Sequence, residues 1–404
     1  MKVLLVHNFY GSSAPSGENQ VFEAERELLL GRGHQVETFT RHSDEIRDKG
    51  AFGTIKGALA TPWNHWMFQG IRQVMQRFKP DVVHVHNTFP LISPAIFRAI
   101  GNRAARVLTL HNYRLFCPAA IPMRAGRVCT ECLDLHTVWP ALRHGCYRNS
   151  RLATVPLAVS VSLHRYFGTW ANQVDAFIVL TEFQREKMTE AGLPIGRVHV
   201  KPNFYPGTPV VEPWVVRRPC AVFAGRLTAE KGITALLRAW LMWGAEAPEL
   251  RIVGDGALRG ELERLACSNP RVPIRFLGQL TGEEAQAEIA HARLLVLPSE
   301  WFEGFPMVVR EAFAFGTPAA VSNIGPLPFI VSHGVNGLVF APADPCSLLG
   351  QLRTAWETPG LLELLGQGAR AEFESKYTRE KNYDMLMKIY GLALTASRSV
   401  TAEL

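Results

Sequence analysis

Long apolar runs are missing from this chain of 404 residues. The longest nearly apolar segment, Leu152 to Leu163, contains Ser, Thr and Pro and is too short to cross a bilayer as a helix. The opening residues Met1 to His7 are too short for the apolar core of a signal peptide, and they predict a first strand instead. We therefore expect neither a membrane span nor a signal peptide.

Cysteine is scarce, and its count of seven is odd. Cys220, Cys267 and Cys346 are dispersed along the second half of the chain, and the other four lie close together in the first half. This distribution argues against the disulfide framework of a secreted protein. The expected location is the cytoplasm.

No block of Lys or Arg and no RNA-binding signature accompanies the formal charge of +7 and the pI near 9.1. This charge favours anionic partners such as nucleotide phosphates or anionic lipid, and nucleic acid is not expected. Residues 51–79 combine Trp63 and Trp66 with Lys56 and Arg72. They predict either a helix packed on a sheet or a basic, aromatic surface in peripheral contact with an anionic membrane.

The dinucleotide fingerprint Gly-x-Gly-x-x-Gly is also absent, because Arg259 stands where its third glycine would be. Short apolar strands nevertheless alternate with amphipathic helices, which predicts parallel sheets. Two such halves follow one another, separated by an irregular, proline-rich segment that begins at Tyr205. The predicted fold class is α/β, with Rossmann-like domains at residues 1–205 and 206–375 and a C-terminal helix within 376–404.

The stretch from Leu294 to Pro326 organises the second half. It predicts a strand, a loop, a helix that begins near Pro306, and a second strand. Glu303 and Glu311 flank the free N–H groups of that helix start, which attract phosphate. Such a site could hold a sugar hydroxyl, a diphosphate and a ribose. The alternative is that both glutamates are merely solvated.

Two cations follow the first strand of the same half. Arg226 and Lys231 lie five residues apart, between the strand that ends at Ala224 and the start of a helix. Arginine supplies a forked donor and lysine a compact charge, so the two could bind a diphosphate together. The alternative is a solvated pair.

The segment from Glu303 to Glu311, Glu-Gly-Phe-Pro-Met-Val-Val-Arg-Glu, resembles the Glu-x7-Glu signature of retaining glycosyltransferases of family 4. This resemblance covers nearly the whole chain. It implies the GT-B fold, in which two Rossmann-like domains face one another across a cleft and a C-terminal helix packs back on the first domain. It also implies that Glu303 contacts the donor sugar and Glu311 the nucleotide ribose. The helix end at the donor diphosphate would comprise Gly304, Phe305, Pro306 and Met307.

Three segments of the first half carry the same resemblance. Leu-Thr-Leu-His-Asn places His111 at a strand end, where the family histidine projects toward the donor sugar; a merely structural histidine is the alternative. The loop from Asn8 to Gly17 is similar to the donor-side glycine loop, although the usual Gly-Gly is Ser-Gly here. Gly17 would then face the donor phosphates. Lys201-Pro202-Asn203-Phe204 is similar to the strand end before the interdomain linker.

No Asp-x-Asp occurs in the chain, so a metal-bridged diphosphate site is not expected. The resemblance implies a retaining hexosyltransferase with a nucleotide-diphosphate sugar as donor. The implied acceptor is a lipid-linked glycan in exopolysaccharide, capsule or O-antigen synthesis, which suggests the inner face of the plasma membrane. Arg226, Lys231 and the helix end would balance the leaving diphosphate, with Glu303 and His111 at the sugar. A sugar-nucleotide epimerase of the same fold and a non-catalytic, zinc-containing scaffold are the alternatives.

Four cysteines lie in an insertion at about residues 114–151, and they are Cys117, Cys129, Cys132 and Cys146. They include a Cys-x2-Cys knuckle, and four thiolates suit a closed tetrahedral zinc site. Such a site would order a segment that has little apolar periodicity of its own. The outer spacing is not that of a standard finger. An iron–sulfur cluster, two redox-active pairs, no metal at all, or replacement of one cysteine by His136 or His144 are the alternatives.

Overall fold

The structure, a computed structural model, describes residues 1–11, 16–48 and 50–402, and it divides into two compact units. Unit 1 comprises Met1–Pro122, Cys129–Pro202 and the C-terminal residues from Asn382, and unit 2 comprises Met123–Val128 and Asn203–Lys381. The main division therefore lies three residues before the predicted boundary at 205/206. Residues 12–15 of the predicted glycine loop lie outside the described part of the chain.

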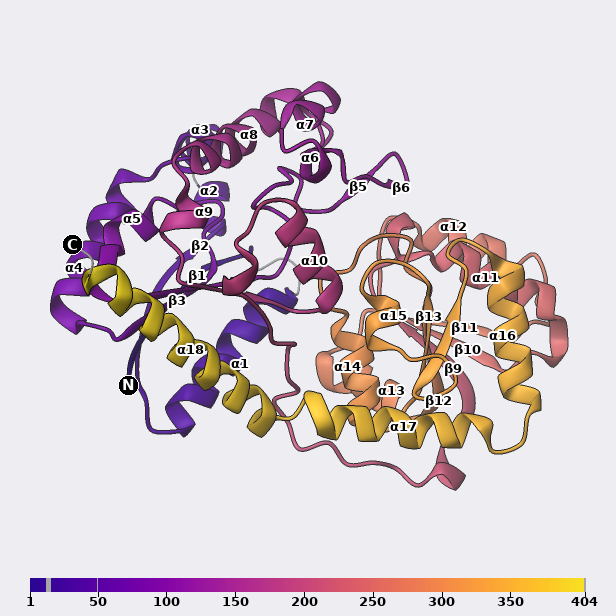
Figure 1. The fold of residues 1–404 in the computed structure, drawn as a ribbon. Helices are drawn as coiled ribbons and strands as arrows, with labels where there is room; N and C mark the ends of the chain where they lie inside the picture. Colours follow the sequence, from indigo (N-terminus) through magenta and orange to yellow (C-terminus); the bar gives the residue numbers. More distant parts are fainter. Residues whose placement is uncertain (12–15, 49, 403–404) are drawn as a thin grey trace. The chain divides into compact units, whose positions relative to one another are not determined.

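Unit 1 contains a six-stranded parallel sheet with the order β2-β1-β3-β4-β7-β8 (Figure 1). Every residue of β3 and β4 is buried, which fits a parallel sheet covered on both faces. The strands are β1 (Lys2–Phe9), β2 (Gln35–His42), β3 (Val82–Asn87), β4 (Ala105–Leu110), β7 (Ala176–Val179) and β8 (Val198–Val200).

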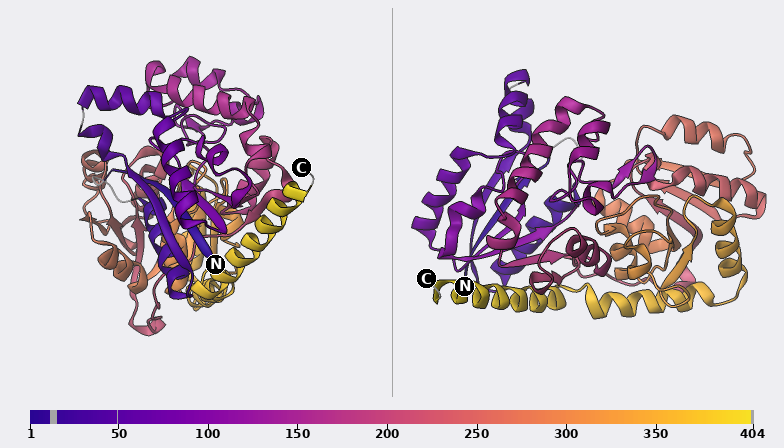
Figure 2. Two further views of the ribbon diagram at one scale, coloured as in Figure 1. Left: turned by 90° about the vertical axis from the view of Figure 1, so that its left-hand side faces the viewer. Right: turned by 45° about the horizontal axis from the view of Figure 1, so that its top comes forward.

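The helices of unit 1 cover the two faces of this sheet. They are α1 (Gly17–Gly31), α2 (Asp44–Arg47), α3 (Gly50–Ala60), α4 (His65–Phe78), α5 (Ile96–Ile100), α6 (Glu131–Asp134), α7 (Trp139–His144), α8 (Arg151–Tyr166), α9 (Thr169–Asn172), α10 (Glu182–Glu190) and α18 (Arg379–Ala402), with 3-10 turns at Gly101–Arg103 and Ile195–Arg197. One cluster of buried side chains joins α1 and α18 to the strands through residues such as Phe22, Leu386 and Tyr390. The C-terminal helix, yellow in Figure 2, thus completes the core of unit 1.

Unit 2 contains a second parallel sheet of six strands, in the order β11-β10-β9-β12-β13-β14. Its strands are β9 (Arg218–Ala224), β10 (Glu249–Val253), β11 (Ile274–Gly278), β12 (Ala292–Leu297), β13 (Ala319–Ser322) and β14 (Gly337–Phe340). The short strands β5 (Met123–Arg124) and β6 (Arg127–Val128) form a separate antiparallel hairpin.

Helices cover the sheet of unit 2, and one core cluster on this sheet contains the fully buried Trp240. The helices are α11 (Ile233–Trp243), α12 (Arg259–Ala266), α13 (Gly282–His291), α14 (Met307–Ala314), α15 (Leu327–Ile330), α16 (Pro345–Glu357) and α17 (Leu361–Lys376), with 3-10 turns at Trp214–Val216, Ala229–Lys231 and Gly244–Glu246. The indole N–H of Trp240 donates to the Pro248 carbonyl at 2.8 Å, so its burial leaves no unmet donor.

Two sequence predictions about helices have clear outcomes. Residues 51–79 form two helices instead of one, because Asn64 caps the start of α4 by accepting from the Trp66 and Met67 N–H groups. The apolar run from Leu152 to Leu163 lies within α8. Over the described residues, no helix has the length and apolar character needed to cross a membrane.

The strand order predicts where each unit binds ligands. In both sheets the chain begins at an inner strand and then builds outward in both directions, so the order reverses between β1 and β3 and between β9 and β12. Open parallel sheets bind ligands beyond the carboxyl ends of the strands at such a reversal. In unit 2 those ends lead into the loops of Arg226 and Glu303.

Candidate active site

The loops that follow β9 and β12 are held together by their backbones. Gly232 has a φ of +67°, and a Cβ atom there would lie 1.8 Å from the carbonyl oxygen of Pro298. Only glycine fits at this contact. The Glu300 N–H also donates to the Glu230 carbonyl at 2.9 Å. These contacts fix the loop of Arg226 and Lys231 against the loop of Glu303.

Lys231 and Glu303 form an ion pair across the two loops, with Nζ 2.7 Å from Oε1. The same oxygen accepts from the Ser299 hydroxyl at 2.6 Å and from the Trp301 indole N–H at 3.1 Å. The Lys231 side chain is 16 % exposed and that of Glu303 is 7 % exposed. Three donors therefore hold one oxygen of a nearly buried carboxylate in place. Lysine has three N–H donors, so Lys231 can serve a ligand as well.

Arg226 occupies a more open position in the same loop. Its side chain is 65 % exposed and lies 3.4 Å from the Glu230 carboxylate, which also accepts from the Thr228 hydroxyl at 2.7 Å. The structure thus gives Arg226 and Lys231 different carboxylate partners. Because Arg226 is solvated, it can turn toward an anion at little cost.

The start of α14 supplies donors next to these cations. Helix α14 begins at Met307, one residue after the predicted start, and its N-cap Pro306 makes no side-chain hydrogen bond. The Val309 N–H donates to the Pro306 carbonyl at 3.1 Å, so the N–H groups available to a phosphate are those of the first two residues, Met307 and Val308. Gly304 and Phe305 lead into this end, and the Phe305 ring packs on Tyr377 with centroids 5.8 Å apart.

Glu311 lies on α14 beyond that first turn. Burial raises the pKa of Glu311, while Arg310, at 3.3 Å, and Gln286 act in the opposite direction. Arg310 is itself buried and donates to the Phe204 carbonyl. Glu311 is thus a shielded acceptor with one cationic neighbour and is not a solvated surface residue. The structure gathers all the predicted site residues of the second half within unit 2.

His111 and Gly17, the other predicted donor-site residues, belong to unit 1. Nε2 of His111 lies 3.1 Å from Nδ1 of His86. Burial, followed by neighbouring His86 and His7, holds the pKa of His111 well below its usual range. Gly17 is the first residue of α1, and Glu18 beside it accepts from the Asn112 side chain at 2.9 Å. The start of α1 therefore lies next to the loop that follows His111.

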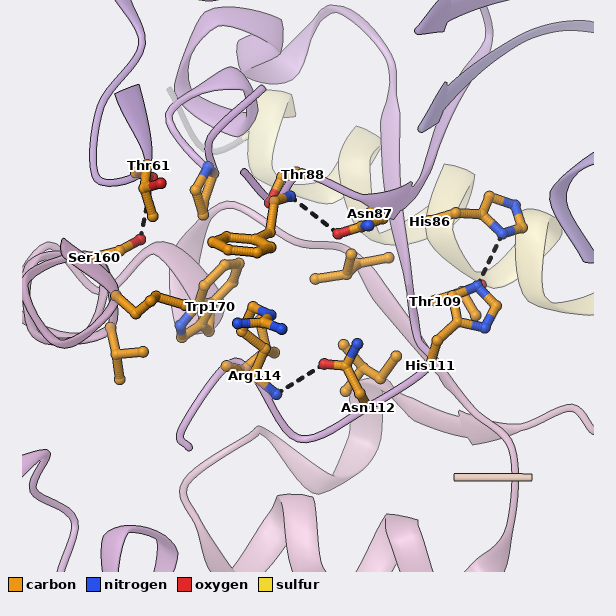
Figure 3. A pocket seen from close by; sticks show the side chains of 17 residues that line it. Thr61, His86, Asn87, Thr88, Thr109, His111, Asn112, Arg114, Ser160 and Trp170 are labelled. Carbon is orange, nitrogen blue, oxygen red and sulfur yellow. Dashed lines mark hydrogen bonds between the residues drawn. The ribbon is translucent and has the colours of Figure 1, made fainter. Parts of the chain in front are cut away.

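His111 also lines a cavity of about 70 Å³ between the end of β4 and helix α8 (Figure 3). Leu108 and Leu110 supply apolar walls together with Val161 and Trp170. Its polar lining comprises Thr61, His86, Asn87, Thr88, Thr109, Asn112, Arg114 and Ser160. An apolar pocket with a few polar groups is the usual form of a small-molecule site.

A buried cluster that sequence reasoning missed lies behind His111. Over residues 1–11, 16–48 and 50–402, the only set of three potential metal ligands whose atoms lie within 4.8 Å of one another is Glu25, His84 and His86. Lys201 Nζ lies 3.0 Å from Glu25, so an ammonium already balances this carboxylate and a metal ion would be repelled. The sequence contained a sign of this cluster, because Glu25 is a charged residue within the apolar stripe of Val21 and Leu28 in α1.

None of the four clustered cysteines forms a disulfide. Burial raises the pKa of Cys117 to about 12 and that of Cys132 to about 11, and neighbouring cysteines add to both shifts. The thiols therefore lie in one region, but they do not approach as closely as the cluster around Glu25 does. The structure does not show the zinc site, which stays a prediction.

Two family models match this chain. The model described as Glycosyltransferase Family 4 matches residues 17–206, and that described as Glycosyl transferases group 1 matches residues 218–358. The chain is 32% identical over 175 residues to an uncharacterized glycosyltransferase of Methanocaldococcus jannaschii, over 43% of this chain and 45% of that protein. It is 27% identical over 311 residues to a sulfoquinovosyl transferase of Arabidopsis thaliana, over 74% of this chain and 54% of that protein. It thus spans about half the length of both relatives.

Structural similarity extends over nearly the whole chain. The crystal structure of the Anabaena protein HepE in complex with UDP has a TM-score of 0.62 and 17% sequence identity, and the match covers 96% of this chain and 99% of that one. The two parallel sheets and this similarity show the GT-B fold. Together the two family models span the strands from β2 to β14, the loops of Arg226 and Glu303, and Glu311. The chain belongs to the family 4 glycosyltransferases.

Proposed function

We propose that the protein is a retaining hexosyltransferase that moves a sugar from a nucleotide-diphosphate sugar to a lipid-linked glycan. The observation that carries this proposal is the Lys231–Glu303 ion pair, which is held at the strand-order reversal of unit 2 beside the open start of α14. It places a cation, an anchored carboxylate and backbone donors at one sheet edge. The UDP bound to HepE supports a nucleoside diphosphate as the ligand.

The donor diphosphate would bind the first-turn N–H groups of α14, with Lys231 and Arg226 as its cations. Glu311 would accept hydrogen bonds from the ribose hydroxyls, since its burial next to Arg310 leaves it shielded from water. Lys231 can bridge Glu303 and a phosphate oxygen at the same time. Lys231 would then link Glu303, which orients the sugar, to the diphosphate, which is the leaving group.

In this proposal, transfer with retention of configuration needs no protein nucleophile. The glycosidic C–O bond breaks and the electron pair goes to the leaving diphosphate, whose growing charge Lys231, Arg226 and the helix end stabilise. The acceptor hydroxyl attacks the same face of the sugar, and its proton passes to the departing phosphate oxygen. Glu303 stabilises the positive charge that develops on the sugar ring. These cations supply the counter-charge that a metal provides elsewhere, and the chain has no Asp-x-Asp motif.

The experiment is a nucleotide-sugar screen by thermal shift, followed by calorimetry and product analysis. A matching nucleoside diphosphate should raise the melting temperature of the wild-type protein, because it binds only the folded state. Transfer to a lipid-linked glycan with retained anomeric configuration is the expected product. Release of an isomerised free sugar or nucleotide sugar would indicate the epimerase alternative, and the absence of any nucleotide binding would indicate the scaffold.

An exposed apolar face of unit 1 supports the membrane as the place of reaction. Helices α3 and α8 pack side by side (Figures 1 and 2). Each exposes an apolar stripe at positions i, i+3 and i+7, the spacing of one helix face. The stripes comprise Phe52, Ile55 and Leu59 on α3, which are 71%, 60% and 73% exposed, and Leu152, Val155 and Val159 on α8, which are 85%, 43% and 47% exposed.

The charges around this face select an anionic lipid surface as its partner. Helices α3 and α8 contain no Asp or Glu, and they contain Lys56, Arg151 and Arg165. Apolar stripes bordered by cations insert into the headgroup layer of an anionic bilayer. The interaction would place the protein peripherally at the inner face of the plasma membrane.

Flotation with liposomes tests this surface. We expect binding to anionic vesicles that weakens with salt, and little binding to zwitterionic vesicles. The triple variant Phe52→Ser, Leu59→Ser, Leu152→Ser should lose binding. Phe329→Ser with Leu364→Ser, at exposed positions of unit 2, is the matched control and should keep it. The proposal would be refuted if the wild-type protein did not bind anionic vesicles at low salt. It would also be refuted if sedimentation showed that the protein self-associates through this face instead.

A structural zinc ion on Cys117, Cys129, Cys132 and Cys146 is a separate proposal. What supports it is the Cys-x2-Cys spacing, the absence of a disulfide at any of the four cysteines and their mutual electrostatic influence. Zinc would draw the thiolates closer together and lower their pKa values. No step of the transfer reaction involves this site.

A further inference from the structure

We infer that the buried Lys201–Glu25 ion pair, acting through His86, holds the His111 ring neutral, with its hydrogen on Nε2. His111 Nδ1 then carries a lone pair and can accept a hydrogen bond from a sugar hydroxyl. The choice of ligand rests on the proposed function, whereas the form of the ring does not. Glu25, Lys201 and His86 would then be positioning residues for His111. Of these four residues, sequence reasoning assigned a role in the donor site only to His111.

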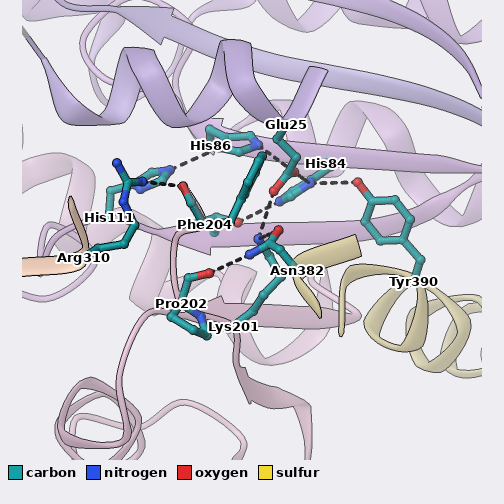
Figure 4. A network of polar contacts seen from close by, with 11 residues as sticks. Glu25, His84, His86, His111, Lys201, Pro202, Phe204, Arg310, Asn382 and Tyr390 are labelled. Atoms are coloured by element: carbon teal, nitrogen blue, oxygen red, sulfur yellow. Dashed lines mark hydrogen bonds and ion pairs between the residues drawn. The ribbon is translucent and has the colours of Figure 1, made fainter. Parts of the chain in front are cut away.

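The network joins five separate elements of unit 1 (Figure 4). Glu25 comes from α1, His84 and His86 from β3, and Lys201 follows β8. Glu25 Oε1 lies 2.8 Å from His84 Nδ1 and 3.2 Å from His86 Nε2, and Oε2 lies 3.0 Å from Lys201 Nζ. His86 Nδ1 then lies 3.1 Å from His111 Nε2.

The protons can be assigned from the carboxylate outward. Burial opposes ionisation of Glu25, but Lys201, His84 and His86 outweigh it and hold the pKa of Glu25 well below its usual range. An ionised carboxylate only accepts hydrogen bonds. Both contacts at Oε1 therefore require a hydrogen on the imidazole nitrogen, which puts one on His86 Nε2 and one on His84 Nδ1.

The charge balance decides the remaining nitrogen of His86. Lys201 and Glu25 are 2% and 1% exposed in their side chains and cancel one another. A second positive charge on His86 would have no counter-charge in this buried site and would be costly. His86 is therefore neutral, with a lone pair on Nδ1. The hydrogen between the two rings must come from His111, which leaves His111 Nδ1 unprotonated.

The C-terminal helix anchors the same network. Asn382 of α18 accepts from Lys201 Nζ at 3.1 Å and donates to the Pro202 carbonyl at 2.7 Å. The Tyr390 hydroxyl of α18 lies 2.9 Å from His84 Nδ1. His84 Nε2 lies 2.7 Å from the Thr109 hydroxyl, which donates to it once Nδ1 carries the hydrogen. Each ring nitrogen at the carboxylate end is thereby accounted for.

This arrangement has a consequence for specificity. His111 lines the cavity beside β4, and a fixed acceptor there favours a ligand with a hydroxyl group at that point. A site built to bind a hydroxyl discriminates against the deoxy analogue, because its polar group is then left without a partner. Apolar residues of equal volume would pack this core as well, so a positioning role explains why charged ones are present.

The first experiment observes the ring nitrogens directly. Long-range ¹⁵N–¹H correlation spectra of histidine-labelled protein distinguish a protonated from an unprotonated imidazole nitrogen, and single His→Gln variants assign the signals. At neutral pH we expect hydrogen on His111 Nε2 and His86 Nε2, and on Nδ1 of His84. A wild-type spectrum with hydrogen on His111 Nδ1 would overturn the inference. This measurement needs no altered network and no substrate.

The second experiment removes the ion pair without leaving a lone charge. The double variant Glu25→Gln, Lys201→Met should give His111 a mixture of ring forms, whereas Glu23→Gln, an exposed glutamate of the same helix, should change nothing. If the double variant does not fold, His86→Leu removes the acceptor of the His111 Nε2 hydrogen and should give His111 the same mixture of ring forms. Ring forms that stay unchanged in a folded double variant would contradict the role of the pair.

Kinetics connect the ring to the reaction. The folded double variant should lose roughly three- to tenfold in kcat/KM, the effect of one misplaced hydrogen bond, and should bind nucleoside diphosphate as tightly as wild type. Its preference for the sugar over the deoxy analogue should shrink by the same factor. An unchanged preference would refute the specificity role. A wild-type protein that transfers no sugar would instead refute the proposed function and leave the spectroscopic result standing.

Discussion

The two units each contain a lysine–glutamate pair, and the pairs differ in what surrounds them. Lys231 and Glu303 come from two loops, and their charged atoms are 2.7 Å apart. Lys201 and Glu25 are buried in unit 1, and their charged atoms are 3.0 Å apart. The lysine side chain is 16% exposed in the first pair and 2% exposed in the second. The loop pair keeps donors available to a ligand, whereas the core pair directs its polar atoms to protein groups. The same two residue types therefore bind a ligand in one place and position a histidine in the other.

Substitution of each lysine separates the two pairs most sharply. Lys201→Met leaves Glu25 as a buried carboxylate without its cation, and the free energy of unfolding should fall by about 3–5 kcal/mol. Lys231→Met should cost less, about 1–2 kcal/mol, because the Glu303 carboxylate keeps its other two donors, Ser299 and Trp301. Denaturant titration of both variants measures this difference. Equal losses of stability would show that the pairs are alike.

Turnover should be more sensitive to substitution of Lys231 than to substitution of Lys201, the reverse of the order expected for stability. Lys231→Met removes a cation from the leaving diphosphate and should lower kcat by roughly 10²- to 10³-fold while the protein stays folded. Arg226→Met, at a solvated position of the same loop, should have a smaller effect. Single-turnover assays of the two variants beside the control Lys388→Met, at an exposed position of α18, provide the test. Unchanged kinetics in both loop variants would remove the loop pair from the mechanism.

The two glutamates of the loop site should divide binding from chemistry. Glu311→Ala should weaken nucleoside-diphosphate binding by about tenfold, since a buried acceptor for the ribose is lost. Glu303→Ala should mainly lower the chemical rate, because Glu303 acts on the sugar. Calorimetry and single-turnover rates separate the two effects. Equal loss of nucleotide affinity in both variants would contradict the assigned roles.

The histidines near the core pair predict a response to acid. Burial lowers the pKa of His7 to about 3, against an unfolded value of 6.5. Between these values only the unfolded chain binds the proton, so the contribution to stability is complete above pH 6.5 and is lost as pH falls below it. Glu25, with its lowered pKa, adds a loss below about pH 4.5. His7→Gln should flatten the dependence between pH 6.5 and 4, and the exposed His65→Gln should not.

The smallest effect on turnover is expected from the cysteine insertion, which belongs to neither pair. Protein purified without a His tag should contain about one zinc ion per chain, and Cys129→Ser should lose the zinc and some thermal stability. Catalysis by the folded variant should change little. Cys267→Ser, at an exposed and dispersed position, is the matched control. A colourless, metal-free protein of full stability would end the zinc proposal.

Much of the fold could be predicted from local sequence patterns. The strand predicted to end at Ala224 does end there, and the helix predicted to begin near Pro306 begins at Met307, because short apolar runs between glycine or proline turns have few other solutions. The prediction of a single helix around Trp63 was wrong. The segment has a helical composition on both sides of Asn64, and the role of Asn64 as the N-cap of α4 was not recognised. The GT-B assignment followed from motifs that each lie within one short segment of the chain.

The sequence by itself determined which residues stand at strand ends: Arg226, Lys231 and Glu303 in one half, and His111 in the other. Only the tertiary structure decided which of them meet. Lys231 reaches Glu303 across 72 residues, and Lys201 reaches Glu25 across 176, because the strand order makes neighbours of segments that are distant in the chain. Local spacing carries no information about such pairings, since they depend on how whole strands and helices pack.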